Sequence, residues 1–407
     1  MSEWKLKDCC LSISDGDHLP PPKTDSGIPF ITISNIDSTN HIDFGNTLFV
    51  PIEYYEKLDD IRKARPNDII YSVVGSFGKP VLIKDDRKFV FQRHIAILRP
   101  NSEIVDSRFL YYVMLSRDFY MQADTVAIGA AQRTISLSSL RNMKVELPPL
   151  PIQLRIATIL SRYDSLIENY QKQIKLLEEA AQRLYKEWFV DLRFPGYEST
   201  KIVDGVPEGW EKKTINDVTC KVTTGLNPRK NFVLGKGSNY YVTIKNMADN
   251  TFFLDDRCDK VDNEALEKIN KRSDLKMGDI LFSGIGTIGR VALVDIPTNN
   301  WNVSESVFTL RANDIVTKEL LYLILLSPDM QNYCQSNAHG AAQKGIRMAD
   351  LKAYSFNLPP FELVQKFTSL VTPTIKKVSS IRNQIRLLTE ARDRLLPMLM
   401  NGEITMF

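Results

Sequence analysis

Polar residues beside glycines are the part of this 407-residue sequence whose types and spacing best suit binding chemistry. They occur in pairs whose members lie 211 residues apart: Asn35/Asn246, Ser72/Ser283, Ser76/Thr287, Lys79/Arg290, Gln132/Gln343 and Arg133/Lys344. Small hydroxyls, amides and single cations on glycine-rich loops are typical of phosphate contacts, which position a protein on a DNA duplex. The alternative is turn formation or helix capping by these side chains. All pairs except Ser72/Ser283 are our candidates for DNA contacts.

A second set of candidates lies in a loop that differs between the two halves of the sequence. The first half has HLPPPKTD at 18–25, and the second half has GLNPRKNF at 225–232. Loops that differ in this way could read different bases, and Arg and Lys are the side chains that most often bind base edges in the major groove. Lys23, Arg229 and Lys230 are therefore our candidates for base contacts.

One glycine motif resembles the phosphate loop of a dinucleotide-binding enzyme. It is Gly284-x-Gly286-x-x-Gly289, but the residues that follow it, VALVDIP, predict a strand. A dinucleotide loop instead needs a helix, whose N-terminus binds the pyrophosphate. The other copy of the motif has Val73 in place of the first glycine. We therefore expect the glycines to form a tight turn rather than a cofactor site.

A duplicated Pro-Pro motif resembles the active-site motif of amino-methyltransferases. It reads NLPPF at 357–361 and ELPPL at 146–150. In those enzymes a polar residue before Pro-Pro accepts a hydrogen bond from the target amino group, whereas Leu147 and Leu358 cannot accept one. The paired carboxylates of a nuclease core are also not found in the sequence. We expect no catalytic residue, and we interpret Pro-Pro as a helix start signal.

Composition narrows the class of protein. The five cysteines form no Cys-x-x-Cys pair and the four histidines are scattered, so we expect reduced thiols and no metal site. The N-terminus has no apolar signal core, and the longest apolar run, at 320–326, is too short to span a membrane. These features predict a cytoplasmic protein without a membrane partner. A net charge of +3, from 52 basic and 49 acidic residues, gives no strong field that would attract a polyanion.

The sequence is an internal repeat with a constant offset of 211 residues. ITISNI at 31–36 recurs as VTIKNM at 242–247, and FLYYVMLS at 109–116 recurs as LLYLILLS at 320–327. The segments 129–149 and 340–360 share nine identities in 21 positions. Chance matches would not share one offset over so long a stretch, so we infer a tandem duplication with pseudo-two-fold symmetry.

Each copy begins with a mixed α+β region. Short alternating runs separated by Gly, Pro and Asn predict strands and turns, and one helix is expected at 106–120 and again near 317–333. The predicted fold class is α+β, with two such domains at 1–150 and 197–360.

Each copy ends in a predicted long helix, at 151–196 and 361–407. Apolar residues recur at alternating steps of four and three from Ile156 to Trp188, which is a heptad seam. The second copy keeps the seam except at Thr374 and Arg392. Pro195-Gly196 and Asn401-Gly402 are expected to end the two helices. Pro373 and Pro397 could kink or shorten the second helix.

The two helices need a partner for their apolar seams. We expect them to pack on each other as an antiparallel coiled coil, which satisfies both seams in one chain. Two alternatives remain: each helix could cover its own globular unit, or both could drive homo-oligomerisation. From 156 to 188 the seam spans about 48 Å, enough for a rigid spacer.

The sequence resembles the specificity subunit of type I restriction-modification enzymes over nearly its whole length. The resemblance is most specific in the helix followed by WFVDLRFPG at 188–196, in VPEGWEKKTINDV at 206–218 and in LLTEARDRLLPMLMNGEI at 387–404. It implies a non-catalytic subunit with two target-recognition domains, each reading one half of a bipartite double-stranded DNA site. The coiled coil would set the gap between the halves.

The resemblance also implies partners and cofactors that composition does not indicate. Two modification subunits would bind S-adenosylmethionine and methylate adenine, and restriction subunits would use ATP and Mg²⁺; this chain would bind no cofactor. Aromatic residues near the end of the first helix are candidate anchors for a modification subunit: Tyr185, Trp188, Phe189 and Phe194. Their alternative role is packing against the second globular unit. The competing function is a coiled-coil scaffold without DNA specificity.

Overall fold

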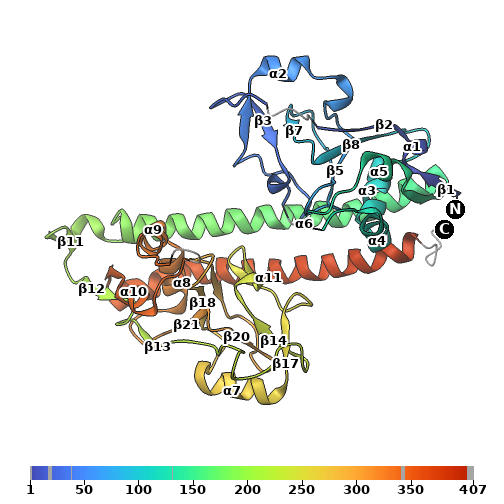
Figure 1. Cartoon of the computed structure of the whole chain (residues 1–407). Coiled ribbons are helices and arrows are strands. Elements are labelled where there is room, and N and C mark those ends of the chain that lie inside the picture. The colour runs from blue at the N-terminus through green and yellow to red at the C-terminus, as the bar shows by residue number, and fades with distance from the viewer. Residues whose placement is uncertain (1, 17–20, 38, 131, 341–343, 401–407) are drawn as a thin grey trace. The chain divides into compact units, whose positions relative to one another are not determined.

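The computed structural model describes residues 2–16, 21–37, 39–130, 132–340 and 344–400. The chain divides into two compact units. Unit 1 comprises Met1–Asn169 and Ile385–Phe407, and unit 2 comprises Tyr170–Gln384. Each unit therefore contains one α+β region and one segment of each of the two long helices, α6 (Leu150–Tyr185) and α11 (Phe361–Met400) (Figure 1).

Unit 1 is built on small sheets that are mainly antiparallel. Its four-stranded sheet has the order β2 (Cys10–Asp15), β8 (Ile95–Pro100), β5 (Ile69–Ser72) and β6 (Pro80–Leu82). A three-stranded sheet has β4 (Leu48–Val50), β3 (Ile28–Ile31) and β7 (Val90–Phe91), in which β3 is antiparallel to β4 and parallel to β7. β1 (Ser2–Lys5) pairs with β9 (Lys144–Leu147). The short helices are α1 (Leu6–Cys9), η1 (Ile33–Asn35), α2 (Ile52–Lys57), η2 (Asp60–Arg62), α3 (Ser107–Leu115), α4 (Arg117–Val126) and α5 (Leu137–Asn142).

Unit 2 repeats this arrangement. Its four-stranded sheet is β13 (Thr219–Thr224), β21 (Val307–Ala312), β18 (Ile280–Ser283) and β19 (Val291–Leu293). Its three-stranded sheet is β17 (Asp259–Val261), β14 (Asn239–Val242) and β20 (Trp301–Val303), and β12 (Glu211–Thr214) pairs with β22 (Ser355–Leu358). Two hairpins are added: β10 (Ile202–Val203) with β11 (Val206–Pro207), and β15 (Met247–Ala248) with β16 (Thr251–Phe252). The short helices are η4 (Tyr197–Ser199), η5 (Ile244–Asn246), α7 (Asn263–Ser273), α8 (Lys318–Leu326), α9 (Pro328–Ser336) and α10 (Met348–Ala353).

The equivalent strand orders confirm the duplication in three dimensions. β5 and β18, β6 and β19, and β9 and β22 begin 211 residues apart, and the strand that follows the glycine motif of unit 2 is β19, as its sequence predicts. The prediction of a single helix at 106–120 was wrong, because the chain forms two helices there, α3 and α4. Ser116 is extended (φ −64°, ψ 150°) and its hydroxyl accepts a hydrogen bond from the Phe119 N–H, which ends one helix and caps the next. Ser327 separates α8 from α9 in the same way.

The two long helices are α6 (Leu150–Tyr185) and α11 (Phe361–Met400). A π-helical turn, η3 (Lys186–Val190), extends α6, so the helical segment ends before the predicted stop at Pro195-Gly196. α11 continues as one helix through Pro373 and Pro397, and its predicted stop at Asn401-Gly402 lies outside the described residues.

α6 and α11 pack together with opposite directions. In unit 2, Trp188 contacts Phe367 (ring centroids 5.6 Å apart), and Glu178 pairs with Arg382 (2.6 Å). Residue numbers therefore increase along α6 and η3 in the direction in which they decrease along α11. In unit 1, Leu160 shares a core cluster with Leu399, and Asp164 pairs with Arg392 (2.7 Å), which gives the same opposite directions. The antiparallel pairing predicted from the heptad seams is confirmed within each unit.

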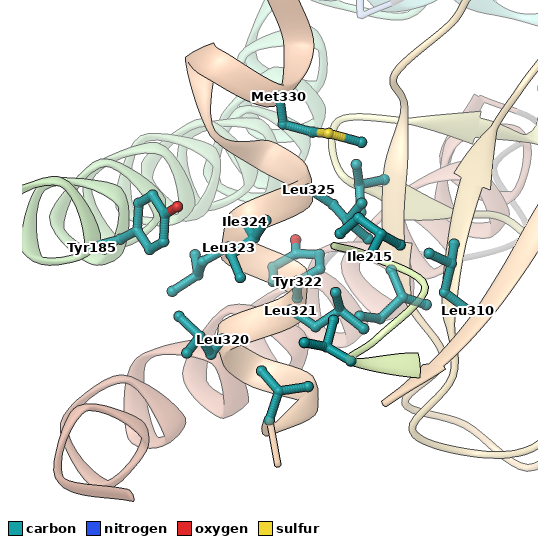
Figure 2. Close-up of a cluster of buried hydrophobic side chains, with 14 of the residues drawn as sticks. Tyr185, Ile215, Leu310, Leu320, Leu321, Tyr322, Leu323, Ile324, Leu325 and Met330 are labelled. Carbon is teal, nitrogen blue, oxygen red and sulfur yellow. The ribbon is translucent and has the colours of Figure 1, made fainter. Parts of the chain in front are cut away.

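The helices also close the cores of the α+β regions. In unit 2, Tyr185 of α6 lies in one cluster with Leu320, Leu323 and Ile324 of α8 (Figure 2). In unit 1, Ile156 and Leu160 pack with Phe109 of α3. Burial of one such side chain contributes about 1.5–3 kcal/mol, so each segment of α6 and α11 is an integral part of the core of its unit. Within the described residues, no helix has both the length and the apolar character needed to cross a membrane.

Candidate nucleic-acid interface

The paired serines are the centres of the glycine turns. The Ser72 hydroxyl donates to the carbonyl oxygen of Ser76 (2.9 Å) and accepts from the Lys79 N–H (2.9 Å). Ser283 makes the same two bonds in unit 2, to Thr287 (2.6 Å) and from Arg290 (2.7 Å). Both serines are fully buried, and the turns contain glycines with positive φ, such as Gly78 at 91°. The expected tight turn is confirmed, and Ser76 and Thr287 carry its exposed polar side chains.

The paired asparagines are also used inside their units. The Asn35 side-chain oxygen accepts from the N–H and hydroxyl of Thr32, and its amide donates to Asn46. Asn246 makes the same set of bonds, with Thr243 and with the carbonyl of Arg257. Both are buried capping residues. Their amides are occupied, which corresponds to the alternative role of Asn in capping.

Three of the paired cations are held by their own unit. Lys79 donates to the Ile36 carbonyl (3.3 Å), and Arg290 donates to Ile244 (2.9 Å) and Met247. Arg133 pairs with Asp124 and lies 5.4 Å from the centroid of the Phe77 ring. The side chains of Lys79, Arg290 and Arg133 therefore already form hydrogen bonds or ion pairs within their own unit.

The loop that contains Arg133 lies against the glycine turn of unit 1, and the loop that contains Lys344 lies against the glycine turn of unit 2. The Gly75 N–H donates to the Arg133 carbonyl (2.9 Å), and the Gly286 N–H donates to the Lys344 carbonyl (2.7 Å). The fold thus places exposed Ser76 near exposed Gln132 in unit 1, and exposed Thr287 near exposed Lys344 in unit 2. Gln343 lies outside the described residues. Among the paired candidates, these four keep the exposed hydroxyls, amide and ammonium that phosphate contacts require.

The three candidates for base contacts are exposed. Arg229 and Lys230 lie side by side in the loop of unit 2, whereas part of the loop at 18–25 lies outside the described residues. Within the part of the chain that the structure describes, the side chains of Lys23, Arg229 and Lys230 form neither ion pairs nor hydrogen bonds. Unpaired exposed cations remain available to base edges or phosphates.

The aromatic candidates for partner contacts lie in unit 2. Tyr185, Trp188 and Phe194 are less than 10% exposed. Phe189 is half-buried, with its ring centroid 4.7 Å from that of Phe367 and 6.0 Å from that of Trp210. This arrangement corresponds to the alternative role, packing against the second globular unit.

Two polar clusters of unit 1 were not predicted from the sequence. Asp164 binds Arg392 and Tyr112, and Glu168 binds His41 and Lys84. Hydrogen bonding to His41 is the main reason that the pKa of Glu168 falls to about 2, and the same bond raises the pKa of His41. The signal was present, because Arg392 interrupts the heptad seam.

A third cluster, in unit 2, lies at the base of the loop that contains Arg229 and Lys230. Its centre is Glu305, whose carboxylate contacts Asn227 and the Tyr241 hydroxyl. Nothing in the local sequence pattern indicates these contacts, because Glu305 lies 78 residues from Asn227. Clusters of three or more potential metal ligands do not occur in the described ranges of the chain.

Comparison with known proteins identifies the family. The model of the type I restriction modification DNA specificity domain matches residues 3–179 and 207–388. The type I restriction enzyme HindI specificity subunit of Haemophilus influenzae is 24% identical over 480 aligned residues, covering 99% of this chain and 100% of that protein. The MjaIX specificity subunit of Methanocaldococcus jannaschii is 27% identical, covering 74% of this chain and 69% of that protein.

A solved structure has the same fold. The crystal structure of the type I restriction-modification system S subunit from M. genitalium superposes with a TM-score of 0.56 at 18% identity, covering 98% of this chain and 95% of that chain. The two matched segments of the family model together span most of the chain, one in each half of the repeat. The chain therefore belongs to the family of type I restriction modification DNA specificity domains, and it is a DNA specificity subunit, the non-catalytic part of a type I restriction-modification system.

Proposed function

We propose that the two α+β regions are separate target-recognition domains, each reading one half of a bipartite duplex site. Domain 1 comprises residues 1–150 and domain 2 comprises residues 197–360, with spacer segments at 151–196 and 361–407. The observation that supports this most directly is the repeat of one strand order in two units, each packed on an antiparallel segment of α6 and α11. A duplicated reader with different loops is suited to two different half-sites.

The proposed division of contacts follows the chemistry of the exposed side chains. Ser76, Gln132, Thr287 and Lys344 contact phosphates and set the position on the duplex. Lys23, Arg229 and Lys230 contact base edges. The remaining candidates, Asn35, Lys79, Arg133, Asn246 and Arg290, support these contacts by shaping the loops, and Gln343 adds a further phosphate contact.

The proposed chemistry resides on partner subunits. Two modification subunits bind S-adenosylmethionine and methylate adenine within the site, and restriction subunits use ATP and Mg²⁺ to translocate and cleave DNA. Phe189, the most exposed of the four aromatic candidates, contributes to the contact with a modification subunit. The complex acts in the cytoplasm, where the five free cysteines remain reduced.

Methylome sequencing tests this proposal. Cells that express the chain with its modification subunits should carry methylated adenine in one bipartite motif, with two defined half-sites separated by a fixed gap. Cells that express the modification subunits alone are the control and should lack these marks. Methylation without a bipartite motif, in cells where both proteins are present and assembled, would refute the proposal.

A further inference from the structure

The loop at 225–232 of unit 2 is anchored at both ends. At its start, a Cβ on Gly225 would lie 1.6 Å from the Val303 carbonyl oxygen, so the backbone approaches β20 as closely as only glycine permits. At its end, Phe232 packs edge-on against Tyr241, with ring centroids 5.5 Å apart. Leu226 and Phe232 both contact the core cluster beneath α7. The loop is therefore a packed element rather than a loose connection.

Backbone bonds fold the middle of this loop into a tight turn. The N–H groups of Asn231 and Phe232 both donate to the Pro228 carbonyl, at 2.6 and 3.0 Å. The Asn231 side-chain amide donates back to the Asn227 carbonyl (2.8 Å), and Lys268 of α7 donates to the Asn231 carbonyl (2.9 Å). These bonds place Arg229 and Lys230 at the apex of the turn. Two adjacent exposed cations are thus presented on a fixed backbone.

Glu305 fixes the base of the turn. One carboxylate oxygen accepts from the Asn227 amide (2.6 Å), and the other lies 3.2 Å from the Tyr241 hydroxyl. That hydroxyl also donates to the Leu226 carbonyl (2.6 Å), so its single proton is shared between two acceptors. Burial and the charge of Glu305 raise the pKa of Tyr241, which keeps the hydroxyl protonated as a donor.

The clamp made by Glu305, Asn227 and Tyr241 has no equivalent at the repeat positions of unit 1. By the strand registers, Arg93 stands where unit 2 has Glu305, and Phe30 stands where it has Tyr241. Neither side chain can accept two hydrogen bonds as a carboxylate does. The clamp is therefore a feature of the second recognition domain, and it holds a loop that differs between the copies.

We propose that Glu305 is a positioning residue for sequence discrimination by the second recognition domain, acting through Asn227 and Tyr241 to aim Arg229 and Lys230 at base edges. This inference rests on the proposed function of that domain. Base recognition requires a cation in one geometry, whereas a phosphate accepts a cation from many directions. Loss of the clamp should therefore lower discrimination between half-sites much more than it lowers affinity for duplex DNA.

The test measures methylation by the complex of this chain with its modification subunits on a library of duplexes in which each half-site is varied separately. Glu305→Ala and Asn227→Ala should each lower the preference for the correct second half-site by about tenfold. Discrimination at the first half-site and the gap length should stay unchanged. The substitution of both Arg229 and Lys230 by alanine should produce the same loss, and combining it with Glu305→Ala should add little.

Two further variants separate positioning from simple loss of structure. Glu305→Gln keeps an acceptor for Asn227 and gains a donor for the Tyr241 oxygen, so it should retain most of the discrimination. Asp314→Asn removes an exposed carboxylate of the same unit outside the loop and should change nothing. Thermal unfolding of each complex reports any loss of folded protein, which would lower methylation equally at all half-site sequences.

The outcomes distinguish this inference from the proposed function. If the wild-type complex reads a bipartite site but Glu305→Ala and Asn227→Ala keep full discrimination, or lose activity uniformly, the positioning role is wrong. If the wild-type complex itself shows no second half-site, the proposed function of the domain is wrong. Relaxation confined to the second half-site, together with the rescue by Glu305→Gln, supports the inference.

Discussion

Asp164 of α6 and Arg392 of α11 form an ion pair at 2.7 Å, at positions where the other copy of the repeat has Ile375 and Ala181. The second carboxylate oxygen of Asp164 accepts from the Tyr112 hydroxyl (2.5 Å), and the repeat position of Tyr112 is Leu323. Unit 2 fills the equivalent positions with apolar side chains that belong to or pack against its core. Equivalent helix segments are therefore polar in one unit and apolar in the other.

The polar triad Tyr112–Asp164–Arg392 predicts an asymmetric response to substitution. Asp164→Ala should lower the free energy of unfolding of unit 1 by about 2–4 kcal/mol, because Arg392 and Tyr112 keep partly buried polar groups with a partner missing. Replacing all three residues by their unit 2 counterparts, as Tyr112→Leu, Asp164→Ile and Arg392→Ala, should restore most of that loss. Urea unfolding, followed by hydrogen exchange in unit 1, measures both effects.

The exposed pair Arg386–Glu390 of α11 is the control for this experiment. Glu390→Ala should cost less than about 0.5 kcal/mol, because exposed i,i+4 pairs contribute little. If Asp164→Ala were as mild as this control, the triad would have no role in the pairing of the helices.

The cluster of His41, Glu168 and Lys84 predicts a pH dependence of the stability of unit 1. The raised pKa of His41 gives stabilisation that is present below the unfolded value of about 6.5 and is lost as pH rises through the folded value. The pKa of Glu168, lowered to about 2, gives stabilisation that is present above about 4.5 and is lost as pH falls. The cluster should therefore contribute most between about pH 5 and 6.5.

Unfolding curves at several pH values test this window. His41→Asn should destabilise unit 1 at pH 5.5 and much less at pH 9, by under about 1 kcal/mol because the His41 side chain is 43% exposed. His94→Asn should behave oppositely, since desolvation lowers the pKa of His94 and its neutral form is favoured in the folded state. A pH-independent effect of His41→Asn would contradict the assignment.

Gly225 is predicted to be essential for the fold of unit 2. The Cβ of Gly225→Ala would collide with the Val303 carbonyl oxygen at 1.6 Å, and a backbone atom cannot move aside as a flexible side chain can. We expect a loss of more than about 3 kcal/mol in unfolding free energy. Gly235→Ala is the matched control: its Cβ meets open space at φ +82°, so it should cost about 1 kcal/mol. Equal melting temperatures for the two variants would refute the packing argument.

Trp188 is predicted to stabilise unit 2 in the isolated chain. It is 6% exposed and lies among Phe189, Phe367 and α11, so Trp188→Ala should cost about 3–5 kcal/mol. Val190→Ala, at a residue that is 46% exposed, should cost less than about 0.5 kcal/mol. Thermal unfolding without any partner measures both. A Trp188→Ala variant that is stable alone and fails only in binding a modification subunit would favour the partner-anchor role.

The spacer proposal predicts how the DNA gap depends on helix length. Inserting one heptad into both helices, after Asn169 of α6 and after Gln384 of α11, lengthens each by about 10.5 Å. This corresponds to about three base pairs of duplex at about 3.4 Å each. Methylome sequencing should show a longer gap between unchanged half-sites. Changed half-sites, or an unchanged gap, would count against the spacer role.

The sequence by itself determined the architecture because its signals are local or periodic. The constant offset of 211 residues, the alternating strand runs and the heptad seams each follow from side-chain spacing along the chain. The same local reasoning merged α3 with α4, since only the conformation of Ser116 shows that its hydroxyl caps a new helix.

The tertiary structure alone decided which polar residues are free to bind and which are already used. Lys79 and Arg290 looked like equivalent phosphate ligands, but each donates to a carbonyl more than forty residues away in sequence. Arg392 looked like a defect in the second seam, and it proved to be the partner of Asp164, 228 residues earlier. A hydrogen bond or ion pair depends on distances in space, and sequence spacing fixes those distances only within a helix or a strand.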